Sequence, residues 1–235
     1  TDGDISAVWA DGEIPPMNTD GIEVHDTNAT IYPGLIDMHN HMHYNTAPLW
    51  EMSPHTSSQT NEFGGYENRY QWKNHPDYKY QVTKPKMFVQ SGSYWNMESQ
   101  SMKYVEAKEI VGGTTSAQGG PSTGEDSFDS ILSRNIEYWN FGADEIHTKV
   151  TELESDYQGN HIISGNQSRE LRAWFLHLAE GMDESSRAEF DILVNNNLLV
   201  GEVIIIHGTA LTSNEFNAMG QVGASLVWSP LSNLL

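Results

Sequence analysis

Apolar runs alternate with amphipathic segments over the last third of the chain. Three runs lack the two-residue alternation of a half-buried strand and are expected to be buried on both faces: 173–181 (AWFLHLAEG), 202–208 (EVIIIHG) and 224–230 (ASLVWSP). Each intervening segment has the start signal of a helix, with one capping box at Ser186 and Glu189 and another at Thr212 and Glu215. This β-α-β-α-β order predicts a parallel sheet with right-handed crossovers, and therefore an α/β fold.

The first two-thirds of the chain have a weaker pattern. Residues 1–30 combine short apolar stretches with Gly, Pro and Asn, which indicates short strands and turns. A strand is expected in LIDMHNH, directly after Pro33 and Gly34. Residues 44–95 are polar and aromatic without clear periodicity, so they are expected to form a long functional loop or a lid. Four more elements are predicted: helices at 102–113 and 127–139, and strands at 114–118 and 145–153.

Charge and composition restrict the partners. The chain has 12 Lys and Arg residues against 32 Asp and Glu residues, a formal net charge of -20, which argues against binding to nucleic acid or to an anionic membrane surface. No apolar stretch approaches the roughly 20 residues of a membrane span. Because the chain has no cysteine, any metal ion must be bound by His, Asp or Glu. The compartment is left open, with the cytoplasm as the preferred expectation.

Histidines gather at the ends of predicted strands. His39 and His41 end the first of these strands, and His177 and His207 lie at the ends of two of the apolar runs. The carboxyl ends of parallel strands form the ligand-binding rim of an α/β fold, so these imidazoles are expected at one rim. His39 and His41 are two residues apart and would share one strand face, where they can bind one metal ion with a third ligand from another strand. The alternative is a chance pair of histidines beside a loop.

Glu180 follows His177 by three residues. The two side chains can act together only if the strand ends near Leu178 and the chain turns, for which Gly181 is suited. A carboxylate in that position could take a proton from a metal-bound water and pass it to a leaving group. In the alternative interpretations, Glu180 belongs to the acidic N-terminal turn of the next helix, and His207 is a satisfied core residue.

Five motifs, in order along the chain, resemble the amidohydrolase superfamily, and in particular its mononuclear branch of cytosine-deaminase-like and chlorohydrolase-like enzymes: PGLIDMHNH (33–41), GGTTSAQGG (112–120), FLHLAEG (175–181), IIIHG (204–208) and SLVWSPLSN (225–233). The resemblance implies a TIM-like (β/α)8 barrel with a small β-sandwich. It also implies that His39, His41 and His177 bind one divalent metal ion, with zinc preferred and iron as the alternative. Glu180 would then shuttle protons, and His207 would bind the metal or orient the hydrolytic water.

The chain departs from that family at its ends. The family's eighth strand carries an aspartate that contacts the metal and the water, and the sequence stops at Leu235, before that strand. Residues 1–30 are assigned to a partial β-sandwich and residues 31–235 to a barrel of about seven strands. Either the chain is a fragment of a longer protein, or the fold is completed by material absent from this sequence. The expected protein partner is such a completing segment or a further copy of the chain in a homo-oligomer. Residues 1–235 alone are therefore expected to have little activity.

The predicted function is hydrolysis of carbon–nitrogen bonds other than peptide bonds, most simply deamination of a small, cyclic substrate by metal-activated water. One alternative is an amidase or a dehalogenating hydrolase that uses the same metal. Another is a non-catalytic, metal-binding remnant of the barrel. The candidate residues of a substrate pocket are Trp50, Tyr70, Trp72, Gln118 and Asn233. The aromatic members of this set offer a stacking surface for a flat ring.

Overall fold

The computed structural model of the chain describes residues 5, 7–18, 20–25, 27–47, 66–119, 132–135, 173–230 and 233. They belong to two units, Thr1–Pro33 and Gly34–Leu235. The described residues of the first unit form turns and irregular segments without a helix or a strand, so the short strands expected there are not observed. Apolar side chains such as Val8 and Ile14 are exposed in this unit and do not form a core that would hold strands together. The assignment of residues 1–30 to a β-sandwich stays a prediction.

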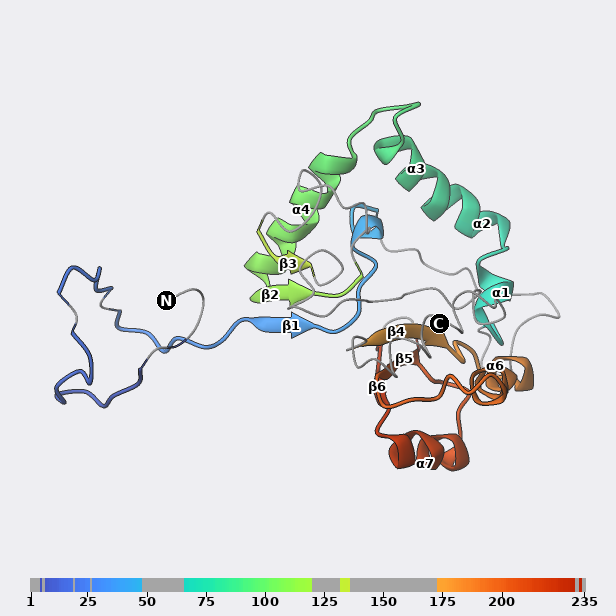
Figure 1. Cartoon of the computed structure of the whole chain (residues 1–235). Helices are drawn as coiled ribbons and strands as arrows, with labels where there is room; N and C mark the ends of the chain where they lie inside the picture. The colour runs from blue at the N-terminus through green and yellow to red at the C-terminus, as the bar shows by residue number, and fades with distance from the viewer. Residues whose placement is uncertain are drawn as a thin grey trace. The chain divides into compact units, whose positions relative to one another are not determined.

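The second unit has an α/β architecture, and its described residues include two three-stranded parallel sheets (Figure 1). The first sheet has the order β1 (Leu35–Asp37), β2 (Thr114–Ala117) and β3 (Arg134–Asn135), and the second has the order β4 (Trp174–Leu178), β5 (Val203–His207) and β6 (Ser225–Val227). Parallel strands that neighbour each other in sequence order are the units of a (β/α)8 barrel. The architecture is therefore consistent with an incomplete barrel.

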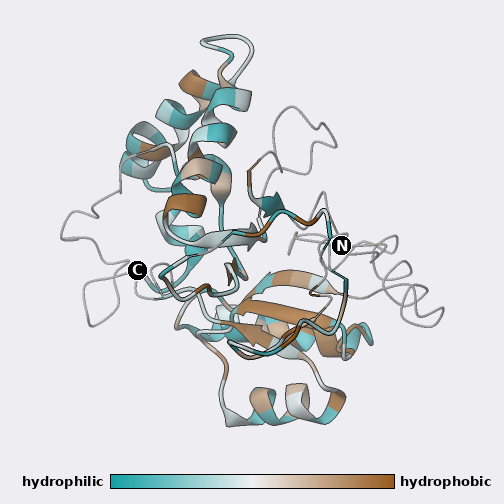
Figure 2. Cartoon of the chain, turned by 90° about the vertical axis from the view of Figure 1, so that its left-hand side faces the viewer, coloured by the Kyte–Doolittle hydropathy of each residue, from teal (hydrophilic) through white to brown (hydrophobic). Residues whose placement is uncertain are grey.

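The second sheet confirms the three strands predicted in the last third of the chain. Leu176 and Ile205 pack with the two helices that connect its strands. Phe175 and Ile206 belong to a separate buried cluster, because neighbouring residues of a strand point to opposite faces. The brown colour of these strands in Figure 2 shows the same apolar character. Burial on both faces fixes the register of the strands and so aligns the strand ends that carry the histidines.

Helix α6 (Glu184–Asn195) connects β4 to β5, and the capping box predicted for it is wrong. Asp183 caps this helix, because its side chain accepts a hydrogen bond from the backbone N–H of Ser186 (3.0 Å). The helix therefore begins before Ser186, and Glu189 lies within it. The carboxylate of Glu189 is used at a different place, described below.

The two other predicted helices that the structure describes are confirmed. Helix α7 (Ser213–Val222) begins with the capping box of Thr212 and Glu215. Helix α4 (Glu98–Val111) begins four residues before the predicted start, and Gly112 caps its C-terminus as expected. No helix among the described residues is long and apolar enough to span a membrane.

Of the two elements predicted between residues 127 and 153, one needs correction and the other is untested. The helix expected at 127–139 is wrong where it can be compared, because Arg134–Asn135 form β3 and pair with β2. The strand expected at 145–153 lies outside the described residues. Short segments of local sequence can form either structure, and pairing with an existing strand decides in favour of the strand here.

The long loop or lid expected at 44–95 is largely helical where it is described. It contains α1 (Arg69–Trp72), α2 (Pro76–Tyr78), the π-helix η2 (Lys79–Thr83) and α3 (Lys84–Gln90). Asn68 caps α1 by accepting hydrogen bonds from two backbone N–H groups, and a proline opens α2. These helices are too short to show a clear apolar period, which explains why the sequence pattern did not reveal them.

Candidate metal centre

His39 and His41 lie in the segment that leaves β1, and they do not extend the strand. The backbone N–H of Asn40 donates to the carbonyl oxygen of Gln118 (2.7 Å), and His41 directly precedes the 3₁₀ helix η1 (Met42–Tyr44). The two imidazole rings nevertheless lie together, with centroids 4.8 Å apart. The expectation of a shared strand face is therefore wrong, and the hydrogen bond to Gln118, the residue that follows β2, helps to place this histidine pair.

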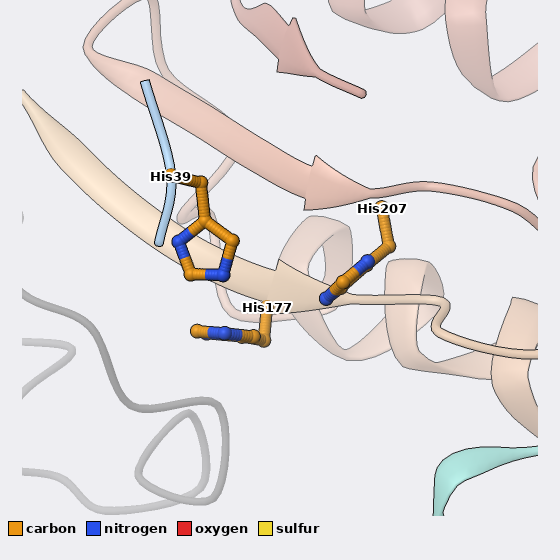
Figure 3. Close-up of side chains that lie close together, drawn as sticks. All are labelled: His39, His177 and His207. Carbon is orange, nitrogen blue, oxygen red and sulfur yellow. The ribbon is translucent and has the colours of Figure 1, made fainter. Parts of the chain in front are cut away.

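The four histidines expected at the strand ends lie close together. The ring centroid of His177 is 4.7 Å from that of His39, 5.1 Å from that of His41 and 5.5 Å from that of His207. One ring nitrogen from each of His39, His177 and His207 can be chosen so that all three lie within 4.8 Å of one another. Figure 3 shows these three imidazoles gathered around a common space. Separate strand ends thus deliver their imidazoles to one place, as the sequence predicts.

This cluster of imidazoles fits a divalent metal ion. Nδ1 of His39 lies 2.7 Å from Oε1 of Gln118, and because an amide oxygen only accepts, Nδ1 carries the proton and Nε2 keeps its lone pair. That Nε2 atom is buried without a hydrogen-bond partner in the described part of the chain. Nε2 of His41 lies 3.1 Å from Nε2 of His177. Two nitrogens that bind one tetrahedral zinc ion at about 2.0–2.1 Å lie about 3.3 Å apart, close to this separation.

Gln118 and Asn233, two of the predicted pocket residues, each contact a histidine of the cluster. Gln118 is buried and holds Nδ1 of His39. Oδ1 of Asn233 lies 2.9 Å from Nδ1 of His207, and its Nδ2 donates to the carbonyl oxygen of His207 (3.2 Å) and to Oγ1 of Thr209 (2.8 Å). Such partners fix the orientation and the tautomer of an imidazole. Contact of either residue with a substrate stays a prediction.

Burial keeps these four imidazoles neutral near pH 7. Burial is the main reason that the pKa of His41 is lowered to about 3, that of His177 to about 2 and that of His207 to about 4. Burial also lowers the pKa of His39. The close approach of the rings acts in the same direction on His41, His177 and His207, because a proton on one ring disfavours a proton on its neighbours. A neutral imidazole is the form that binds a metal ion, so protons do not compete for this cluster at neutral pH.

Glu180 approaches the same cluster from the turn that follows β4. The strand ends as expected, and the chain turns at Ala179, whose φ of 56° lies in the left-handed region, two residues before the expected Gly181. Oε2 of Glu180 lies 3.5 Å from Nε2 of His207 and 3.8 Å from Nη1 of Arg69. Burial raises the pKa of Glu180 to about 7, although the Arg69 guanidinium acts in the opposite direction. A carboxyl group with a pKa near neutrality is suited to general acid–base catalysis.

Of the three aromatic residues predicted to line a substrate pocket, the structure describes two, and both lie in a helix. Trp50 lies outside the described residues. Tyr70 and Trp72 belong to α1 and not to a loop. The hydroxyl of Tyr70 donates to Oε1 of Glu189 (2.8 Å), whereas the ring of Trp72 lies edge-on to that of Tyr78 with centroids 5.0 Å apart.

Sequence reasoning missed two charged residues of this region, Arg69 and Glu189. The Arg69 guanidinium lies 3.8 Å from a carboxylate oxygen of Glu180 and 4.0 Å from one of Glu189. Asn68 directly precedes Arg69 and is a favoured residue for a helix N-cap, so it could have indicated the helix that carries this arginine. The local sequence of Glu189 indicates a capping box and contains no sign of its actual contacts.

No protein-family model and no curated protein matches the chain. Among solved structures, an adenosine deaminase from Xanthomonas campestris with bound zinc matches with a TM-score of 0.57 and 16% sequence identity, over 86% of this chain and 50% of that one. The fold is shared with a zinc-bound deaminase. A mutant of the atrazine chlorohydrolase TrzN from Arthrobacter aurescens TC1, complexed with zinc and atraton, matches with a TM-score of 0.48 and 10% identity, over 83% of this chain and 52% of that one. Only the first likeness is close enough to show a common fold, and the chain spans about half the length of each of these proteins.

Proposed function

We propose that the protein is a metal-dependent hydrolase of carbon–nitrogen bonds other than peptide bonds, of the mononuclear amidohydrolase type, that removes an amino group from a small cyclic substrate. The position of Glu180 carries this proposal, because its buried carboxyl group lies 3.5 Å from His207 at the edge of the imidazole cluster. The fold shared with a zinc-bound deaminase supports the same reaction class. Zinc is the proposed cofactor, and iron is the alternative.

His39, His41 and His177 would hold the ion, and His207 is the fourth candidate. A bound zinc ion supplies Lewis-acid chemistry, which lowers the pKa of water towards neutrality. The buried Nε2 of His39 and the short distance between His41 and His177 are the features that support this set of ligands.

Glu180 moves the proton in the proposed reaction. Its pKa of about 7 means that both its protonated and its ionised forms are populated near neutral pH. The ionised carboxylate accepts a proton from the attacking water, and the resulting carboxylic acid donates it to the leaving amine. Arg69 favours the ionised form of Glu180, and His207 lies beside the same carboxylate oxygen.

The test is ammonia release by the zinc-loaded, complete protein from a panel of cyclic amines, with cyclic amides and aryl halides assayed in parallel. Glu180→Gln keeps the side-chain shape and removes the proton acceptor, so kcat should fall by roughly 10²–10⁴-fold while zinc content stays unchanged. Glu184→Gln, at an exposed position at the start of α6, is the matched control and should leave both values unchanged.

Three results would contradict the proposal. Near wild-type turnover by Glu180→Gln would show that Glu180 does not transfer the proton and has a structural role only. Halide release without ammonia release would identify a dehalogenating hydrolase instead. Full zinc binding without turnover of any of the three substrate classes would favour a non-catalytic metal-binding protein.

A further inference from the structure

We propose that Glu189 is a positioning residue that holds the turn after β4 in the backbone conformation that directs Glu180 at the imidazole cluster. Glu189 lies on α6, nine residues after Glu180 in the sequence, and it does not touch any of the four histidines in the contacts described above. It acts on the site through the backbone of Ala179 and through the side chains of Tyr70 and Arg69. The inference rests on the catalytic role proposed for Glu180.

The conformation of Ala179 is the first observation. Its φ of 56° is in the left-handed region, which a residue with a Cβ atom rarely adopts without support from its surroundings. This turn ends β4 directly before Glu180 and changes the direction of the chain there. In an extended conformation the strand would continue, and the Glu180 side chain would leave from a different place.

The partner of the Ala179 amide is the second observation. Its N–H donates to Oε2 of Glu189 at 2.7 Å, and both groups are buried. A hydrogen bond to an ionised carboxylate is short and roughly twice as strong as one between neutral groups. The carbonyl oxygen of Ala179 accepts from the backbone N–H of Ala210 (3.2 Å), so the peptide groups on both sides of this residue are held.

The second carboxylate oxygen of Glu189 connects the same turn to α1. Oε1 accepts a hydrogen bond from the Tyr70 hydroxyl (2.8 Å), and that hydroxyl accepts one from Nη2 of Arg69 (3.1 Å). Arg69 in turn pairs with the Glu180 carboxylate (3.8 Å), and its backbone N–H donates to the Glu180 carbonyl oxygen (3.1 Å). One buried carboxylate thus fixes Glu180 from two directions, through the backbone before it and through the arginine beside its side chain.

Four variants of the complete chain separate positioning from simple packing. Glu189→Ala removes the hydrogen bonds to the Ala179 amide and to the Tyr70 hydroxyl. Glu189→Asp shortens the side chain by one methylene and replaces the alanine variant in the test if that variant does not fold. Glu189→Gln keeps an oxygen acceptor for the Ala179 amide but removes the charge. Glu184→Ala, on the exposed side of the same helix, is the control, because its carboxylate pairs only with Arg187 among the contacts described for it.

The first readout needs no substrate. In protein labelled with ¹⁵N-alanine, the Ala179 amide proton should be shifted downfield and exchange slowly in the wild type, Glu184→Ala and Glu189→Gln. Both properties should be lost in Glu189→Ala and Glu189→Asp. Crystal structures should then show the Glu180 carboxylate displaced from His207 in the last two variants only. A Glu180 carboxylate that keeps its distance of 3.5 Å from His207 in Glu189→Ala or Glu189→Asp would overturn the proposal.

The second readout is ammonia release at full zinc occupancy. Misplacement of a catalytic group by about 1 Å costs roughly 10²-fold in rate, so kcat of Glu189→Ala should fall by about 10–100-fold with KM nearly unchanged. Glu189→Gln should retain kcat within about threefold, because the Ala179 hydrogen bond persists. A Glu189→Gln protein as impaired as Glu189→Ala, with its Ala179 amide still protected, would show that the charge matters and not the position. If Glu180 is displaced in Glu189→Ala and Glu189→Asp as predicted but the wild type releases no ammonia, the proposed function fails and the positioning role stands.

Discussion

Zinc binding by this protein should depend little on pH between about 7.5 and about 5.5. An ordinary histidine with a pKa near 6.5 is about 90% neutral at the upper limit and about 10% neutral at the lower one. A site with three such ligands would therefore lose roughly 10³-fold in zinc affinity over this range, because each ligand must release its proton.

The structure predicts a much smaller change. Burial lowers the pKa of His41 to about 3, that of His177 to about 2 and that of His207 to about 4. A histidine with a pKa of about 4 is still roughly 97% neutral at pH 5.5, so protonation of these three imidazoles should change the affinity by less than about twofold. Burial also lowers the pKa of His39, so this ligand should contribute less than the roughly tenfold loss of an ordinary histidine. The sign follows from burial: because the folded protein disfavours the imidazolium form, protons begin to compete with zinc at His41, His177 and His207 only as the pH falls towards about 4.

The assay is competition for zinc with a chelator whose own pH dependence is known, with circular dichroism at each pH to confirm that the protein stays folded. A decrease in affinity of about 100-fold or more between the two pH values, without unfolding, would show that these imidazoles titrate like exposed ones. Burial would then not be what keeps these imidazoles ready to bind a metal ion.

Two further predictions concern the backbone around the site and the stability of the second sheet. Gly119→Ala should weaken zinc binding by at least tenfold in the same assay. The added Cβ atom would overlap the carbonyl oxygen of Asn40 and so displace His39 and His41, which flank Asn40. Unchanged zinc affinity would show that the close approach of Gly119 to Asn40 does not matter for the site. Thr212→Ala removes the N-cap of α7 and should lower the free energy of unfolding by about 1 kcal/mol in urea titrations, with zinc affinity unchanged. A loss of zinc-binding free energy of the same size would show that Thr212 also supports the metal site.

The second sheet could be predicted from the sequence because local pattern and tertiary packing agree there. The runs that form β4 and β5 are apolar at successive positions, and both faces of these strands are buried. β3 is the opposite case. Its two residues, Arg134–Asn135, lie in a stretch whose local pattern indicates a helix, and their pairing with β2 makes them a strand.

The histidines of the site could be predicted for a topological reason, since parallel strands end at one rim. The bonds that orient them could not. His39 is held by Gln118, 79 residues away, and Tyr70 reaches Glu189 across 119 residues. A local pattern reports which face of an element is apolar, but it contains no information about partners at such distances in the sequence.

The central claim is that His177 and its neighbouring histidines bind one metal ion. The most direct test is the zinc content of the purified, complete protein after dialysis against a zinc buffer, measured by inductively coupled plasma mass spectrometry. The wild type should retain about one zinc ion per chain, and His177→Ala should retain less than about one tenth of that amount. His25→Ala, at an exposed position in the first unit, should bind zinc as the wild type does. Full zinc occupancy in His177→Ala, or none in the wild type, would contradict the account.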